Sequence, residues 1–352
     1  MKVSIGMKLR QGPWGGGNQF GNALVGFLER QGVEVYFDLS QPNLDLILLC
    51  EPRSTLQISA FSESDIFHYL NHVNAETLVI QRINECDERK GTQGINQRLK
   101  LANLAVDYTV FVASWLRDLF VDQGLPCQRT GVILNGSDPA IFHAQGYHSW
   151  DRQSPLKIVT HHWGGHWMKG FDVYSALDEK LAEQPWSHPV RFTYIGNVPE
   201  GFQFRHAQHI APLHGAALAD QLRQHHVYLT ASLNEPGGHH QNEGASCGLP
   251  LLYRESGCMP EYCQGFGLSF TEDTFIEKLQ AMMDGYESFV PKMKDYPHNA
   301  ERTSRAYYQL FQTLLDEKGQ IVSDRAKYRF WKWLALRPKP SPKALIKSWL
   351  RR

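Results

Sequence analysis

The six cysteines of this 352-residue chain form no Cys-x-x-Cys pair and are scattered from Cys50 to Cys263. Unpaired spacing of this kind predicts reduced thiols in a reducing, cytoplasmic setting. Long apolar runs are missing too: none approaches the roughly 18–20 residues that a membrane-spanning helix needs. The first residues, MKVSIGMKL, are typical of a short strand rather than of a targeting segment. We therefore expect a cytoplasmic protein.

Metal-binding motifs are also missing. Six of the sixteen histidines occur as adjacent pairs, at 161–162, 225–226 and 239–240, and neighbouring side chains diverge on a helix or a strand. There is no His-Glu-x-x-His spacing, and no Asp-x-Asp motif follows a predicted strand. We expect no metal ion and no other cofactor.

Net charge is lacking as well, because 36 Lys and Arg balance 36 Asp and Glu. The balance is uneven along the chain, however. Residues 325–352 contain ten basic residues and no acidic one, so the remainder has 26 basic and 36 acidic residues. We expect no nucleic-acid partner for this acidic main part, and the basic tail requires a separate explanation.

Short apolar runs alternate with amphipathic stretches on both sides of the polar stretch 143–155. Near-continuous hydrophobicity in such runs is typical of parallel strands that are covered on both faces. We predict an α/β protein with two doubly wound, Rossmann-like domains facing a cleft. The N-terminal domain covers 1–150, the C-terminal domain 151–315, and a helix with a basic tail 316–352. The predicted strands are KVSIGM, VEVYF, LDLILLC, TLVIQRI, YTVFVA and TGVILNG in the first domain, and LKIVTHH, RFTYIG, HVYLTAS, PLLYR and GLSF in the second.

The segment ASLNEPGGHHQNEGASCGLPLLY (231–253) joins a predicted strand to a helix expected from about His239 to Gly248. Ligands of doubly wound sheets bind where strands end and helices begin. Glycines in the connecting loop let the backbone approach a ligand closely, and Glu235 and Glu243 flank that loop. By itself Glu243 would be a solvated helix carboxylate. Two glutamates around an anion-receptive loop suit a ligand with both phosphate and hydroxyl groups, such as a nucleotide sugar.

The segment 231–262 resembles the C-terminal signature of the retaining, GT-B-fold glycosyltransferases of family 4. That signature contains Ser-x-x-Glu, a Gly-rich loop, a second Glu eight residues after the first, Cys-Gly-Leu-Pro and Pro-Glu. The segments VASWLRDLFVDQG, VILNGSDPAIF and MKGFDVY are similar to other family motifs and occur in the family's order. The resemblance covers about 1–315. It implies GT-B architecture and metal-independent transfer of a sugar, with retention, from a nucleotide-sugar donor to an acceptor hydroxyl.

The resemblance also implies roles for individual residues. Lys169 would neutralise the departing diphosphate, Glu235 would lie against the donor sugar, and Glu243 would bind the ribose hydroxyls. We take Lys169 and Glu235 as the catalytic candidates. A Gly-rich loop after the first strand would contact the donor across the cleft, with Asn18 as a further candidate. The predicted donor-binding residues are Gly16, Gly17, Lys169, Glu235, Pro236, Gly237, Gly238, His239 and Glu243.

One family feature is missing. Family members usually have a Gly-Arg about five residues before the lysine, whereas this chain has THHWGGHWMKG, with His161, His162, Trp163 and His166 in that stretch. Either a histidine supplies the second donor to the phosphates or the diphosphate is held differently. The aromatic side chains could equally pack the seam between the domains.

The acceptor side is less specific. Arg82, Asn84 and Asp87 lie at or just beyond the end of the predicted strand TLVIQRI, where the cleft should be. These polar groups suit hydrogen bonds to sugar hydroxyls, and they suit an ordinary surface loop equally well.

Two other functions need to be weighed. The Gly-rich turn and Asp38 imitate the fingerprint of an NAD-dependent Rossmann oxidoreductase, but its third glycine would fall on Phe20, and Gly21 comes one residue late. That function also leaves 231–261 unexplained. A catalytically weak glycan-binding or scaffold subunit of the same fold would fit the missing arginine, although Lys169, Glu235 and Glu243 argue against it.

The tail RAKYRFWKWLALRPKPSPKALIKSWLRR has two basic amphipathic pieces. The first is rich in aromatic residues and suits a C-terminal helix that returns to the first domain. The second, 343–352, has the charge density that suits an anionic membrane leaflet. We expect 338–352 to contact the inner face of the cytoplasmic membrane. A glycan or lipid-linked acceptor would be met there, in the synthesis of a cell-surface polysaccharide, lipopolysaccharide or glycolipid.

Overall fold

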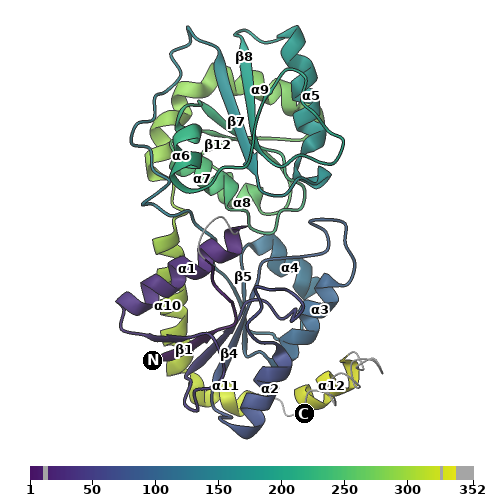
Figure 1. Cartoon of the computed structure of the whole chain (residues 1–352), viewed down its shortest axis with the longest axis vertical. Helices are drawn as coiled ribbons and strands as arrows, with labels where there is room; N and C mark the ends of the chain where they lie inside the picture. The colour runs from purple at the N-terminus through teal and green to yellow at the C-terminus, as the bar shows by residue number, and fades with distance from the viewer. Residues whose placement is uncertain (11–14, 326–327, 338–352) are drawn as a thin grey trace.

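The computed structural model describes residues 1–10, 15–325 and 328–337, and it contains two six-stranded sheets (Figure 1). All strand pairs within the two sheets are parallel. The prediction of two doubly wound domains is therefore confirmed. Central strands such as β3 (Leu46–Leu49) and β11 (Leu251–Arg254) are buried throughout, as their continuous apolar sequences predict.

The first sheet has the order β2-β1-β3-β4-β5-β6. Its most polar central strand is β4 (Leu78–Ile83), which is buried along its whole length although it contains Gln81 and Arg82. The Gln81 side chain is satisfied there, because it donates to Leu99 O at 3.2 Å and accepts from Asn103 at 2.7 Å. The remaining elements of this part of the chain are β1 (Lys2–Ile5), α1 (Gly15–Arg30), β2 (Glu34–Tyr36), α2 (Glu63–His72), α3 (Ile95–Ala102), η1 (Asn103–Ala105), β5 (Tyr108–Phe111), α4 (Ser114–Asp122) and β6 (Thr130–Val132).

The second sheet has the order β12-β11-β10-β7-β8-β9, which is the strand order of a dinucleotide-binding Rossmann domain. The order reverses between β7 (Leu156–His162) and β10 (Val227–Thr230), and the loops after these two strands flank that point. Strand β9 (Gln208–Ile210) was not predicted, because its sequence is polar and largely exposed. The other elements are η2 (Trp167–Lys169), α5 (Phe171–Glu183), β8 (Val190–Gly196), α6 (Gly215–Arg223), α7 (His240–Ser246), α8 (Met259–Cys263), β12 (Gly267–Phe270), η3 (Glu272–Thr274), α9 (Phe275–Phe289) and η4 (Val290–Asp295).

The last helices return to the first domain. Helix α10 (Ala300–Asp316) runs beside α1 in Figure 1, and its Tyr307 lies 5.1 Å from the ring centroid of Phe20. Tyr307 and Phe311 belong to the same buried cluster as the side chains of β1 and β3. The domain limit that the sequence placed at residue 315 therefore differs from the structure, in which the second domain ends before α10. Periodicity alone cannot show against which sheet an amphipathic helix packs.

Two chain segments pass between the domains side by side. Ser137 and Asn299 form a parallel bridge, and a β-carbon on Gly136 would lie 2.1 Å from the Asn299 carbonyl carbon. Only glycine permits this approach of two backbones. Beyond α11 (Lys318–Asp324), helix α12 (Tyr328–Leu336) packs Trp333 against Phe67 of the first domain. This packing accords with a structural role for the first aromatic piece of the tail, whereas 338–352 lies outside the described residues.

Candidate functional site

A cavity of about 410 Å³ lies between the domains, at the point where the strand order of the second sheet reverses. Crevices at such points are where doubly wound folds bind ligands. The start of α1 and the loop after β4 form one wall, and the loops after β7, β8, β9 and β10 form the other. Its lining includes Gly16, Gly17, Gln19, Arg82, Asn84, Arg89, Lys90, Asn135, His161, His162, His166, Lys169, His214, Glu235, Gly237, Gly238, His239, His240 and Glu243.

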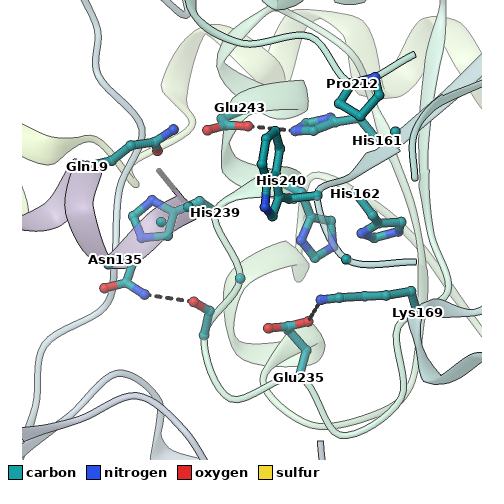
Figure 2. Close-up of a pocket in the computed structure, with 18 of the residues that line it drawn as sticks. Gln19, Asn135, His161, His162, Lys169, Pro212, Glu235, His239, His240 and Glu243 are labelled. Carbon is teal, nitrogen blue, oxygen red and sulfur yellow. Dashed lines mark hydrogen bonds and ion pairs between the residues drawn. The ribbon is translucent and has the colours of Figure 1, made fainter. Parts of the chain in front are cut away.

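Lys169 and Glu235 form a buried ion pair in this cavity. Lys169 Nζ donates to Glu235 Oε2 at 2.5 Å (Figure 2). Burial lowers the pKa of Lys169, and the Glu235 carboxylate opposes that shift. Burial would raise the pKa of Glu235, but the charges of Lys169 and Arg89 outweigh it and hold that pKa far below its usual value. Glu235 is therefore ionised at neutral pH and paired with Lys169, with one group on each loop of the switch point.

The glycine that follows Lys169 in the sequence is required for steric reasons. Gly170 has a φ of +100°, and a β-carbon there would lie 2.4 Å from the β-carbon of Ala231. Glycine is thus needed both for the backbone conformation and for the close approach to the end of β10. Leu233 N donates to Met168 O at 2.8 Å, which ties the two loops together beside the ion pair.

Glu243, on α7, is held by a contact with His161 of β7. His161 Nε2 donates to Glu243 Oε2 at 2.6 Å (Figure 2). The Tyr228 hydroxyl lies 3.0 Å from the other ring nitrogen of His161. Burial raises the pKa of Glu243, but the hydrogen bonds from His161 and Gln19 lower it below its usual value. The carboxylate is therefore ionised, buried and oriented, unlike a solvated helix glutamate.

The glycines allow the two walls to come together. A β-carbon on Gly16 would lie 2.3 Å from His239 Cδ2, and one on Gly237 would lie 2.4 Å from Val112 Cγ2. Asn135 Nδ2 donates to the carbonyl of Gly237 at 2.7 Å, which fixes the loop 233–238 to the first domain. Arg82 in turn donates to Asn135 Oδ1 at 3.0 Å. Close contact across the cleft therefore depends on the absence of side chains at these two positions.

Four histidines around the cavity, His162, His166, His239 and His240, are uncharged at neutral pH. Burial, together with neighbouring cations, lowers the pKa of His166 to about 4, and burial lowers that of His239 to about 4. Burial holds the pKa values of His162 and His240 well below the usual range, with the neighbouring His240 adding to the shift of His162 and the charge of Lys169 to that of His240. The ring nitrogens of His166 and His239 have no hydrogen-bond partner within the protein. These two rings are thus available as neutral donors or acceptors to a ligand.

The predicted acceptor residues divide in the structure. Arg82 and Asn84 line the cavity, and the buried Arg82 guanidinium carbon lies 4.0 Å from the centroid of the Phe20 ring. Asp87 does not line it: its carboxylate accepts hydrogen bonds from the N–H groups of Ile95 and Asn96, both at 3.0 Å. Asp87 therefore shapes the loop before α3 instead of facing the cleft.

Two donor-side predictions also fall outside the lining. Pro236 is buried and does not face the cavity. Asn18 holds the Gly-rich segment in place, because its side chain accepts a hydrogen bond from Arg10 N at 2.8 Å and donates one to Arg10 O at 2.7 Å. The sequence reading missed Arg89 and Lys90, which follow Asp87 by two and three residues and do line the cavity. It also missed Gln19, next to the glycines, and Asn135 in the segment VILNG. Each of these lay within a segment already singled out.

No group of three or more His, Cys, Asp or Glu in the described ranges is arranged to hold a metal ion. Within the same ranges, no helix is both long enough and apolar enough to span a membrane.

The architecture is the GT-B fold, as comparison with solved structures shows. The chain is similar to sucrose-phosphate synthase from Thermosynechococcus elongatus, with a TM-score of 0.65, 12% identity and coverage of 90% of this chain and 99% of the other. It is similar to HepE from Anabaena in complex with UDP and glucose, with a TM-score of 0.61, 12% identity and coverage of 89% and 100%. For the apo form of the lipopolysaccharide outer core galactosyltransferase WaaB, the TM-score is 0.64, the identity 11% and the coverage 89% and 100%.

Sequence comparison adds a further relative, which matches part of the chain. No family model matches the chain. The gpi3 subunit of phosphatidylinositol N-acetylglucosaminyltransferase from Schizosaccharomyces pombe is 28% identical over 183 residues, which are 45% of this chain. The match spans 39% of the length of that curated protein, or about two fifths.

Proposed function

We propose that this protein is a retaining glycosyltransferase, which moves a sugar from a nucleotide-sugar donor to an acceptor hydroxyl. The observation that carries the proposal is the pairing of Lys169 with Glu235 beside the His161–Glu243 pair, in one cavity at the switch point. A cation, two oriented carboxylates and neutral imidazoles suit a ligand that combines phosphates with hydroxyl groups. Structurally similar proteins include one whose crystals hold UDP and glucose.

In this proposal the second domain binds the donor. Glu243, fixed by His161 through one oxygen, accepts hydrogen bonds from the ribose hydroxyls through the other. Lys169 lies where negative charge grows as the bond between the sugar carbon and the diphosphate oxygen breaks, and such preorganised charges are usually the largest catalytic contribution. Glu235 and the loop Gly237–Gly238 lie against the donor sugar, and Gly16 and Gly17 of the first domain close the site where Gly16 meets His239.

The transfer needs no covalent intermediate with the protein. The acceptor oxygen attacks the sugar carbon on the face from which the diphosphate leaves, and its proton passes to a diphosphate oxygen. Configuration is thereby retained, and every bond and proton is accounted for. We propose that no metal ion takes part, since Lys169 can supply the positive charge.

We propose that the acceptor belongs to a cell-surface polysaccharide, lipopolysaccharide or glycolipid. The similar proteins include one named for the lipopolysaccharide outer core and one for phosphatidylinositol. In the first domain, Arg82 and Asn84 are placed for acceptor contacts. Residues 338–352, outside the described part of the chain, carry the basic amphipathic sequence through which we propose contact with the anionic inner leaflet.

The test is a panel of UDP-, GDP- and dTDP-sugars. A donor that binds only the folded protein raises its melting temperature, so a thermal-shift screen identifies the base and the sugar. Slow hydrolysis of the same compound, unaffected by excess EDTA, would then demonstrate catalysis. A compound that is bound but never hydrolysed or transferred would indicate a binding subunit instead, and the absence of any binding would refute the proposal.

A further inference from the structure

The loop between β4 and α3 brings two cations to the cavity from the first domain. Its shape is fixed by Asp87, which accepts hydrogen bonds from Ile95 N, Asn96 N and the Thr92 hydroxyl, each at 3.0 Å. The loop also touches the second domain, because Asn234 Nδ2 donates to Glu88 O at 3.2 Å. The residues after Asp87 are therefore held in place at the domain boundary.

Arg89 points from this loop towards Glu235. Glu85 orients it by accepting hydrogen bonds from Arg89 Nη1 at 3.1 and 3.3 Å. Arg89 Nε lies 3.5 Å from Glu235 Oε1 and makes no hydrogen bond there. Lys169 occupies the other oxygen of the same carboxylate. Glu235 thus lies between a cation of the first domain and a cation of the second.

The charges around the cavity are not balanced by the protein itself. Arg89, Lys90 and Lys169 line it, and the carboxylates that contact them are Glu85 and Glu235. Arg82 and Glu243 line the cavity as well, so four cations face three carboxylates. His166, on the same wall as Lys169, adds buried ring nitrogens without a protein partner. The cavity has an excess of positive charge, and Arg89 Nε has no hydrogen-bond partner in it. Such a cavity suits a ligand with several negative charges close together.

We propose that Arg89 is the second cation of the diphosphate subsite, delivered from the N-terminal domain opposite Lys169. This inference rests on the proposed function and assigns one further residue to the donor site. The α- and β-phosphates would lie between Arg89 and Lys169, with His166 donating an uncharged hydrogen bond. The donor diphosphate would consequently contact both domains at once and stabilise their closed arrangement.

The test uses three variants of the full-length protein: Arg89→Ala, Arg89→Lys and the control Arg53→Ala. Arg53, like Arg89, is close enough to Glu85 to be affected by its charge. Arg53 is, however, paired with Glu51 at 2.7 Å and does not line the cavity. Calorimetry would compare UDP with uridine, GDP with guanosine, dTDP with thymidine, and inorganic pyrophosphate alone.

We expect Arg89→Ala to weaken the binding of the nucleoside diphosphate and of pyrophosphate roughly ten- to hundredfold, with nucleoside affinity unchanged. Arg89→Lys should give an intermediate loss, because it keeps the charge but not the planar fork. Arg53→Ala should match the wild type.

Equal losses for the nucleoside and the diphosphate would indicate a structural role and overturn the assignment. If Arg89→Ala binds the nucleoside diphosphate as tightly as the wild type does, the assignment is also overturned. This includes the case in which only the KM for the acceptor rises. Failure of the wild-type protein to bind any of these probes would instead refute the proposed function, and with it this inference.

Discussion

Gly16 of the first domain lies directly against the imidazole of His239 in the second: a β-carbon would come within 2.3 Å of Cδ2 and 3.0 Å of Cγ. The contact closes one side of the cavity, and it exists because residue 16 has no side chain. Any substitution must displace the imidazole of His239, the loop that carries it, or α1.

Gly16→Ala should therefore weaken donor binding while leaving the protein folded. Overpacking of this kind typically costs about 1–3 kcal/mol, which corresponds to roughly a ten- to hundredfold loss of affinity. Calorimetry with the donor found by the thermal-shift screen measures it. Gly26→Ala, in the same helix with its nearest contact at 3.6 Å, is the matched control and should bind normally. Equal affinity of both variants would show that the closed contact is not needed for binding.

Lys169→Ala should lower turnover far more than it weakens donor binding. The ammonium acts most strongly as the diphosphate departs, so we expect kcat to fall by about a hundredfold or more. Steady-state kinetics with saturating donor measure this. Because the substitution leaves Glu235 buried with Arg89 as its remaining cationic neighbour, a lower melting temperature should accompany it. Lys180→Ala, on the exposed face of α5, serves as control. A kcat equal to that of the wild type would remove Lys169 from the mechanism.

Glu243→Gln tests the proposed ribose contact. The amide oxygen can still accept from His161, but the other atom then presents N–H groups to the ligand instead of an acceptor. Donor affinity should fall by roughly ten- to hundredfold, the usual range for a hydrogen bond to a charged group. The comparison is with Glu179→Gln, an exposed position on α5. Unchanged affinity in Glu243→Gln would place this carboxylate outside the donor site.

Acid should destabilise the protein through its buried neutral histidines. Burial lowers the pKa of His225 to about 4, and this ring hydrogen-bonds Gln221 O and the Thr193 hydroxyl far from the cavity lining. Between pH 6.5 and 4 the unfolded chain binds a proton at His225 that the folded chain does not. Stability is therefore full above pH 6.5 and declines as the pH falls towards 4. Thermal melts from pH 7.5 to 4.5 should show this decline, and His225→Gln should make it shallower. An unchanged slope would contradict the assignment.

Deleting residues 338–352 should release the protein from anionic liposomes without affecting donor binding. Five basic residues lie in 338–352, and each one near an anionic surface contributes about 1 kcal/mol. Flotation at low salt with phosphatidylserine vesicles measures this, and zwitterionic vesicles provide the control. Full-length protein that ignores the anionic vesicles would rule out this membrane contact.

Strand positions were predictable because parallel strands buried on both faces leave continuous apolar runs, as in LDLILLC and HVYLTAS. The spacing of Glu235 and Glu243 was likewise visible, since both lie within one loop–helix segment. The sequence could not show which side chains of a loop face the cavity. Asp87 and Arg89 are two residues apart, yet one turns back to hold α3 and the other faces the cavity. The orientation of the Asp87 side chain depends on the N–H groups of Ile95 and Asn96, which are in place to donate only once α3 has formed.

The packing of α10 on α1 also has a consequence for synthesis of the chain. Phe20, Tyr307, Phe311 and Leu314 share one apolar cluster, so the first domain is assembled from the two ends of the sequence. A ribosome releases residues 1–150 long before it makes residues 300–314. The nascent first domain must therefore wait with uncovered apolar side chains on α1 until residues 300–314 have emerged. Fragments that stop near residue 150 should aggregate, and the second domain is the one able to complete its core first.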